Sequence, residues 1–153
     1  MKRIFIDKDK CDGCKNCSLA CMQAHREQSG TLYDLDLLDP RNEARHHIVS
    51  DGKGGYVPIF CRHCSVPDCV GACMSGALKK DPSTAHIQYD EKRCGTCFMC
   101  VMSCPYGNVK PDKASRTKIL KCDFCTNDNE DPNCVKACPK KALYLEEVAV
   151  WGV

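Results

Sequence analysis

The sequence of 153 residues lacks the features that mark membrane-anchored and secreted proteins. No apolar run approaches the about 18 residues that a membrane-spanning helix needs, so we expect no insertion into a membrane. Residues 1–9 include only three consecutive apolar residues, too few for the apolar segment of a secretory signal peptide. The many reduced cysteines suit an anaerobic cytoplasm, so we expect a cytoplasmic protein.

Motifs for catalysis are also missing. The sequence has no nucleophile paired with a base, no glycine-rich dinucleotide loop and no phosphate-binding loop, so we expect no enzymatic activity from this chain alone. Asp34, Asp36 and Asp39 alternate with leucines and have no partnered base, which indicates a solvated loop rather than a carboxylate site.

Cysteine, by contrast, is abundant. Sixteen cysteines form four blocks of four, and every block opens with C-x-x-C and closes with C-x-x-x-C. The third block has the C-x2-C-x2-C-x3-C-P pattern of bacterial iron–sulfur proteins, in which three thiolates hold one 4Fe–4S cluster and the fourth binds another. With four ligands for each cluster, the cysteines predict four 4Fe–4S clusters. The blocks are Cys11, Cys14, Cys17 and Cys21; Cys61, Cys64, Cys69 and Cys73; Cys94, Cys97, Cys100 and Cys104; and Cys122, Cys125, Cys134 and Cys138.

Other uses of cysteine fit these blocks less well. Disulfide scaffolds are usually secreted domains of fewer than about 80 residues. Zinc sites usually pair C-x2-C units across longer gaps, often with histidine. Both alternatives stay open, but the four-cysteine runs favour neither of them. A radical-SAM site needs C-x3-C-x2-C, and no window of the sequence has that spacing.

Composition agrees with a cluster-binding protein. The hydrophobic fraction of 43% includes the cysteines, which leaves a thin conventional core. We therefore expect the clusters to supply part of the core and metal binding to be coupled to folding. The formal net charge is +2. Bound anionic clusters outweigh this charge, so we expect no nucleic-acid partner.

Short strand patterns accompany the blocks and repeat the unit of a ferredoxin. The x3 step before each last cysteine is close to one helical turn, which predicts a short helix there. Two further apolar segments, 47–49 and 56–60, flank a glycine-rich stretch and predict a two-stranded ribbon, either a structural connector or a partner-docking element. The strands expected around the blocks are 3–7, 87–90 and 118–120 before them, and 76–78 and 141–145 after them.

Several single residues receive structural rather than ligand roles. We expect His63, which lies inside the second block, to be structural because all four cysteines of that block are present. The tail around Trp151 is apolar, and we expect it to pack on the body or in a partner. Surface positions are expected for His25, His46, His47 and His86, and a solvated basic face for Lys110, Lys113, Arg116, Lys118 and Lys121.

The order of the four spacings resembles the four-cluster electron-transfer subunits of the DMSO reductase iron–sulfur subunit family. The resemblance covers nearly the whole chain and extends to the residues around the cysteines. The short length and the segment 72–77 are most similar to the compact CooF-like branch, which is associated with carbon monoxide dehydrogenase. The matching motifs are Phe60-Cys61-Arg62-His63-Cys64, Tyr89-Asp90-x3-Cys94, Lys121-Cys122-Asp123-Phe124-Cys125 and Cys138-Pro139-x2-Ala142-Leu143.

This resemblance implies an α+β fold of two ferredoxin-like halves of βαβ type, one nested within the other and each with two clusters. The outer half would comprise 1–25 and 118–147, and the inner half 57–117. A connector with the β-ribbon would span 26–56, and a tail 148–153. The implied ligand sets are Cys11, Cys14, Cys17 and Cys138; Cys122, Cys125, Cys134 and Cys21; Cys61, Cys64, Cys69 and Cys104; and Cys94, Cys97, Cys100 and Cys73.

The resemblance also implies a function. We expect a non-catalytic subunit that relays single electrons between a catalytic oxidoreductase and a flavin- or ferredoxin-type acceptor. The catalytic partner would be a carbon monoxide dehydrogenase, a tungsten or molybdenum enzyme such as an aldehyde oxidoreductase or formate dehydrogenase, or a hydrogenase. A freely diffusing low-potential polyferredoxin is the alternative, and an iron–sulfur redox sensor is a weaker one.

Overall fold

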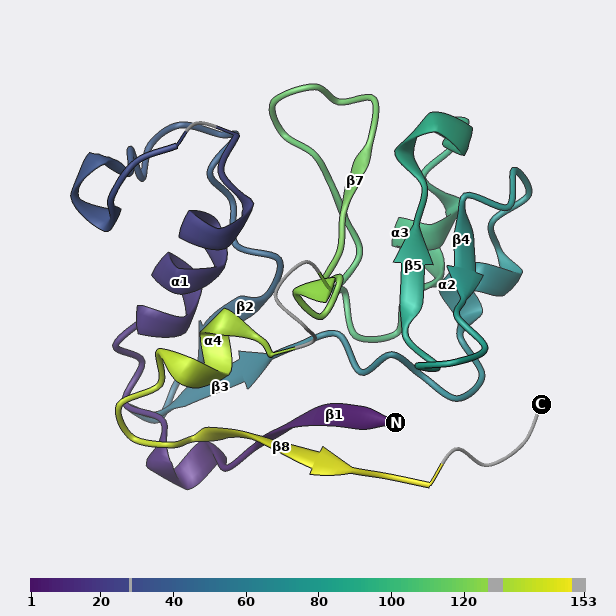
Figure 1. The fold of residues 1–153 in the computed structure, drawn as a ribbon. Coiled ribbons are helices and arrows are strands. Elements are labelled where there is room, and N and C mark those ends of the chain that lie inside the picture. Colours follow the sequence, from purple (N-terminus) through teal and green to yellow (C-terminus); the bar gives the residue numbers. More distant parts are fainter. Residues whose placement is uncertain (28, 127–130, 150–153) are drawn as a thin grey trace.

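The computed structural model describes residues 1–27, 29–126 and 131–149. These residues form a small mixed α/β structure with two lobes (Figure 1). The helices are α1 (Asn16–His25), α2 (Asp68–Gly71), α3 (Met99–Ser103) and α4 (Asn133–Lys136). The strands are β1 (Lys2–Ile6), β2 (His47–Ser50), β3 (Tyr56–Ile59), β4 (Leu78–Lys80), β5 (Ile87–Tyr89), β6 (Lys110–Pro111), β7 (Ile119–Leu120) and β8 (Leu143–Glu147).

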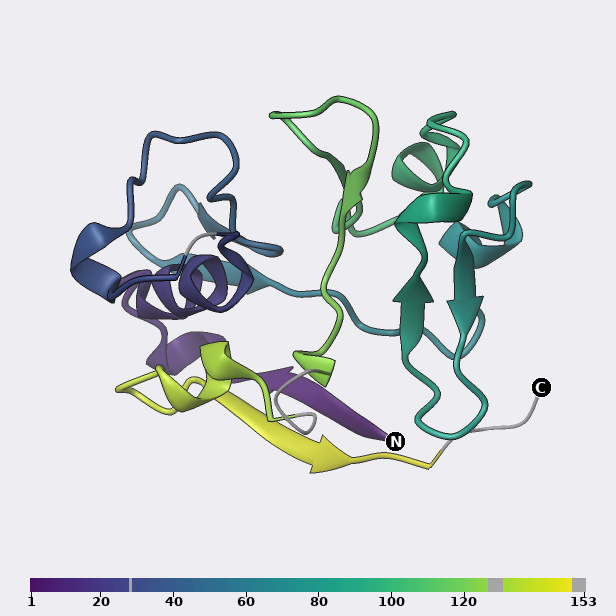
Figure 2. The ribbon, with the colours of Figure 1, turned by 45° about the horizontal axis from the view of Figure 1, so that its top comes forward.

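Every described strand pairs with one antiparallel partner, and the pairs are β1–β8, β2–β3, β4–β5 and β6–β7. The β1–β8 pair joins segments from opposite ends of the sequence, with Ile4 opposite Leu145. Helices α1 and α4 lie together over this pair, whereas α2 and α3 pack together beside β4 and β5 (Figure 2). The ribbon predicted from the two apolar segments is confirmed as β2–β3, with His47 opposite Ile59.

The helices follow the cysteine spacing closely. Helix α1 carries both Cys17 and Cys21, so the x3 step of the first block is one turn of helix, as expected. In the other blocks the helix carries the third cysteine and ends before the fourth. The fourth cysteine therefore leaves the helix axis, where its thiol is free to face a neighbouring block.

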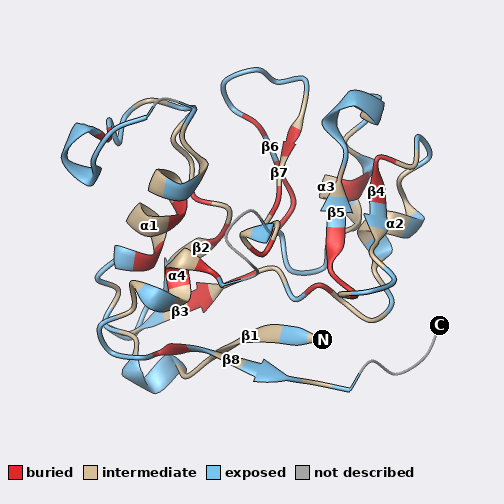
Figure 3. Cartoon of the chain, viewed as in Figure 1, coloured by how far each residue is buried: buried red, intermediate tan, exposed pale blue. Residues whose placement is uncertain are grey.

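Two small hydrophobic cores, whose buried residues are red in Figure 3, each include cysteines. The first core lies in the lobe of α1 and α4, and the second lies in the lobe of α2 and α3. Because sulfur atoms occupy these cores, their stability depends on what the thiols bind. The first comprises Cys17, Phe60, Cys134 and Leu143, with Cys138 packed against them. The second comprises Leu78, Ile87, Cys100, Val109 and Ile119, with Cys69, Cys73 and Cys104 packed against them.

An aromatic cluster joins the lobes. Phe124, from the fourth block, stacks on His86 with ring centroids 4.0 Å apart and meets His63 edge to face at 5.7 Å. His86 Nε2 lies 3.0 Å from the carbonyl oxygen of Lys2 in β1, which ties the β4–β5 hairpin to the other lobe. Stacking of this kind adds to the burial of the rings.

The expected surface position is wrong for two of the histidines. His86 is 1% exposed, in the aromatic cluster, and His46 is 5% exposed because its ring stacks on Phe60. His46 Nε2 also lies 3.1 Å from Ser18 Oγ. His25 and His47 are half-buried. Sequence gave no sign of this burial, because the covering residues come from distant segments.

The expected solvated basic face is wrong for Lys110 and Lys121, which are both buried. Lys110 Nζ lies 2.8 Å from Glu43 Oε1, and the segment around Ala44 covers it. Lys113 and Arg116 are exposed and Lys118 is half-buried. The segment 26–56 thus covers Lys110, which the sequence pattern predicted to be exposed.

Among the described helices, none has the length and apolarity to cross a membrane. The predicted apolar tail is described only to residue 149, so Trp151 lies outside the described residues.

The aromatic cluster generates a prediction about stability. Phe124 is 1% exposed. Replacing a buried phenylalanine by alanine removes apolar burial and leaves a cavity, so Phe124→Ala should lower the free energy of unfolding by about 3–5 kcal/mol. Denaturant titration of the cluster-loaded protein without oxygen measures this loss. Tyr144→Ala is the control, because Tyr144 stacks on Phe5 but is 39% exposed. Equal losses of unfolding free energy in the two variants would show that the aromatic cluster stabilises the fold no more than a partly exposed ring pair does.

Candidate iron–sulfur sites

The four C-x-x-C loops share one backbone feature. In each loop, the residue before the second cysteine has a left-handed conformation. Only one of these residues is glycine, and a left-handed non-glycine residue costs about 1–3 kcal/mol unless the surroundings impose it. Repetition of this conformation indicates a common cradle, since such turns direct successive backbone N–H groups toward an anion. The residues, with their φ angles, are Gly13 (72°), His63 (44°), Thr96 (56°) and Phe124 (62°).

All sixteen cysteines are described, and all are free thiols. The structure brings together cysteines that are distant in sequence. Cys138 of the fourth block lines one cavity with three cysteines of the first block, Cys11, Cys14 and Cys17. Cys104 of the third block lines a second cavity with Cys61, Cys64 and Cys69 of the second block.

Electrostatic effects on the thiols support one of these groupings and indicate two more. Burial, with a smaller contribution from the Cys138 thiol, raises the pKa of Cys17 to about 11. Burial likewise raises the pKa of Cys100, with a contribution from Cys73. The pKa of Cys134 is raised by burial together with Cys122 and Cys21.

The fourth cysteine of every block accepts a backbone hydrogen bond. In the last three blocks the donor follows closely in the sequence. Leu78 N lies 3.4 Å from Cys73 Sγ, Asn108 N lies 3.4 Å from Cys104 Sγ, and Ala142 N lies 3.2 Å from Cys138 Sγ. Such N–H···S bonds favour the thiolate, the form that binds metals.

Cys21 departs from this pattern because its donors come from elsewhere. Its backbone donor is Arg45 N, 3.4 Å from the sulfur, and His25 Nδ1 lies 3.7 Å away. Burial acts to raise the pKa of Cys21. Hydrogen bonds from His25 and His46 outweigh burial and lower this pKa to about 6.

An ion triad supports Cys21. Asp123, from the fourth block, lies 3.1 Å from His25 Nε2 and 2.7 Å from Arg45 Nη1. Burial opposes charge at His25, yet the Asp123 and Cys21 hydrogen bonds raise the pKa of His25 to about 9. The His25 ring thus lies between the Asp123 carboxylate and the Cys21 sulfur, and the Arg45 guanidinium pairs with the same carboxylate. Sequence reasoning missed this triad, because no local pattern links Arg45 to a cysteine 24 residues away.

The residues fit iron–sulfur clusters. The donors are soft thiols in blocks of four, two groups of four line a common cavity each, and backbone amides donate to the fourth sulfur of every block. Repeated left-handed loops supply further N–H groups. When bound, a cluster supplies one-electron chemistry with little change of geometry. The chain contributes the ligands, the hydrogen bonds and the exclusion of water.

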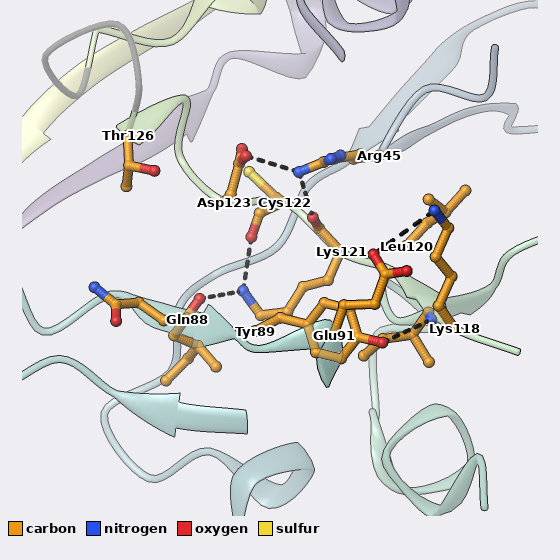
Figure 4. A pocket seen from close by; sticks show the side chains of 12 residues that line it. Arg45, Gln88, Tyr89, Glu91, Lys118, Leu120, Lys121, Cys122, Asp123 and Thr126 are labelled. Carbon is orange, nitrogen blue, oxygen red and sulfur yellow. Dashed lines mark hydrogen bonds and ion pairs between the residues drawn. The ribbon is translucent and has the colours of Figure 1, made fainter. Parts of the chain in front are cut away.

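A polar cavity of about 380 Å³ lies where the lobes meet (Figure 4). Cys122 lies at one side of it, and residues of β5 and β7 form the other sides. Arg45 and Asp123 pair at its rim. Lys121 reaches across it, with Nζ donating to the carbonyl oxygens of Ile87 and Cys122 at 2.7 and 2.6 Å.

Fold and site together define an iron–sulfur protein of ferredoxin type. The chain belongs to the 4Fe-4S dicluster domain family, whose pattern matches residues 53–148. Membership of this family indicates iron–sulfur clusters.

Named relatives agree with this assignment. Electron transport protein HydN of Escherichia coli (strain K12) is 32% identical over 157 residues, which cover 92% of this chain and 85% of HydN. The beta subunit of NADH-dependent phenylglyoxylate dehydrogenase of Aromatoleum evansii is 36% identical over 92% of this chain and 29% of its own length. The chain is therefore homologous to an electron transport protein and to an oxidoreductase subunit.

A solved structure shows the same fold. A chain of the active site complex BamBC of benzoyl coenzyme A reductase, in complex with 1,5-dienoyl-CoA, has a TM-score of 0.53 and 27% identity. The match covers the whole of this chain and 79% of that one.

The triad generates a prediction. Arg45→Met removes the guanidinium from the half-buried Asp123 carboxylate. A hydrogen bond to a charged group contributes about 1.5–3 kcal/mol, and we expect a loss of that size in the free energy of unfolding of the cluster-loaded protein. Arg41→Met is the control, since Arg41 pairs with Asp39 but its side chain is 54% exposed. A loss no larger than that of the control would show that the triad does not stabilise the fold.

Proposed function

We propose that the chain is a relay subunit with four 4Fe–4S clusters, arranged in two nested ferredoxin-like halves. The outer half, 1–25 and 118–147, would enclose the inner half, 57–117, with 26–56 as connector. One observation carries this proposal: cysteines of the first and fourth blocks share one hydrophobic core, and those of the second and third share the other. The β1–β8 pair, which brings the ends of the outer half together, also supports it.

The proposed ligand sets exchange the fourth cysteine between paired blocks. The two lined cavities support the sets that contain Cys138 and Cys104. The mutual effects on thiol pKa support those that contain Cys21 and Cys73. The sets are Cys11, Cys14, Cys17 and Cys138; Cys122, Cys125, Cys134 and Cys21; Cys61, Cys64, Cys69 and Cys104; and Cys94, Cys97, Cys100 and Cys73.

We propose that electrons cross between the lobes through the loops of Cys122 and Cys61. Burial raises the pKa of Cys122 to about 12, and the Cys61 thiol is the largest charge effect that adds to it. This effect supports a short distance between the two cysteines, which belong to different lobes. Phe124 and His63, from the same two loops, keep water out of the junction.

We infer that the relay serves a catalytic oxidoreductase. The likeness to a chain of the benzoyl coenzyme A reductase complex and to the phenylglyoxylate dehydrogenase subunit supports this class of partner. Within it, carbon monoxide dehydrogenase, tungsten or molybdenum enzymes and hydrogenases are the proposed candidates, and the CooF-like resemblance around residues 72–77 favours the first. The proposed acceptor is a flavin or ferredoxin protein, and the proposed location is the cytoplasm.

A freely diffusing electron carrier is the second candidate. The match with HydN, named an electron transport protein, spans 85% of that protein. A carrier of this kind needs no permanent catalytic partner.

The exchange of cysteines gives a testable prediction. Cys138→Ala should damage the cluster held by the first block and leave the one held by the rest of the fourth. Cys104→Ala is the matched variant for the inner half and should damage the cluster of the second block. Iron analysis and electron paramagnetic resonance of the reduced proteins measure the loss. If Cys138→Ala removed the fourth-block cluster while the first-block cluster kept its signal, the exchange scheme would be wrong.

The relay proposal predicts what the protein binds in its own cells. Purification from the native host without oxygen should yield a stoichiometric complex with a redox enzyme. Recovery of the chain alone, with about sixteen iron atoms for four clusters, would favour the diffusing carrier. If the anaerobically reconstituted protein bound markedly fewer than about sixteen iron atoms, the proposal of four clusters would be contradicted.

A further inference from the structure

Lys121 is a buried cation at the junction of the lobes. Its residue exposure is 4%. Its ammonium donates to the carbonyl oxygens of Ile87, in β5, and Cys122, in the fourth block (Figure 4). The side chain therefore bridges the two lobes with its charge enclosed between them.

The charge of Lys121 lacks a carboxylate partner. Among the residues that the structure describes, no acidic group makes an ion pair with Lys121 Nζ. The closest acid in sequence, Asp123, pairs instead with Arg45 and His25. Lys110, the other buried lysine, differs because it pairs with Glu43. An isolated buried ammonium is costly, so its stable burial requires negative charge of another kind nearby.

Proposed cluster ligands adjoin both acceptors of the Lys121 ammonium. Ile87, whose carbonyl oxygen accepts from Nζ, lines the cavity of Cys61, Cys64, Cys69 and Cys104. The second acceptor is the carbonyl oxygen of Cys122 itself, in the fourth block. Two proposed ligand sets, one in each lobe, thus lie beside a single cation, and their thiolates supply the negative charge.

The geometry points to Lys121 as a positioning residue that sets the reduction potentials of the two clusters adjoining the junction. This inference rests on the proposed function, because it assumes clusters on the Cys69 and Cys122 ligand sets. A fixed positive charge favours the reduced, more negative state of each cluster and raises its potential. An electron that crosses the junction leaves one ligand set and enters the other, and no bond or proton changes. Lys121 thereby raises the reduction potentials on both sides of this step together.

The test is an anaerobic redox titration of the reconstituted full chain, read by electron paramagnetic resonance. Lys121→Met keeps the length of the side chain and removes its charge. We expect the reduction equilibrium of two cluster signals to shift about tenfold or more toward the oxidised form, about 59 mV for one electron, with smaller shifts in the others. Lys121→Gln, which keeps a hydrogen-bond donor, should show the same shift and serves if the methionine variant fails to fold.

Lys118→Met is the matched control. Lys118 lines the same cavity, but its side chain is 27% exposed and lies 3.7 Å from Glu91, so this variant loses the same formal charge from a screened position. We expect no signal to shift tenfold in the control. Equal shifts in both variants, or no tenfold shift in either Lys121 variant, would overturn the inference and leave Lys121 as a structural tie. Iron content of the unaltered protein tests the proposed function separately, since a deficit there would not depend on Lys121.

Discussion

The structure depends on a single constraint, which is that cysteine sulfurs from different blocks lie together in common cavities. Cys138 lines a cavity with three cysteines of the first block, and Cys104 lines one with three cysteines of the second block. The β1–β8 pair and the packing of α1 on α4 satisfy this constraint in one lobe, and β4–β5 with α2 and α3 satisfy it in the other. Because the apolar cores are small and contain cysteines, ligation and folding are parts of the same process.

Polar groups around the cysteines divide into local and distant donors. Cys73, Cys104 and Cys138 accept from amides that follow them within a few residues, so their surroundings repeat as the blocks repeat. Cys21 accepts from the connector through Arg45, and the triad with Asp123 binds that connector to the fourth block. The segment 26–56 thus contributes to a site through Arg45.

The junction between lobes is the most specialised region. Aromatic rings of Phe124 and His86 exclude water there, while Lys121 adds a charge that the described carboxylates do not balance. Burial makes this charge effective, since electrostatic interactions are stronger where water is absent. In the proposed relay, a cation shared by two adjoining centres raises both of their reduction potentials together.

The sequence by itself determined the sixteen thiols, their four blocks, the short helices, most of the short strands and the β2–β3 ribbon. It did not predict β6, and the strand expected at 76–78 lies instead at Leu78–Lys80. The features that it did determine follow from spacing and periodicity, which act over a few residues. Tertiary structure decided the burial of His46, His86, Lys110 and Lys121, which local patterns placed at the surface. It also decided that the connector supplies a donor to Cys21. These outcomes depend on which distant segments cover a residue, and the residues next to it in the sequence do not show which segments those are.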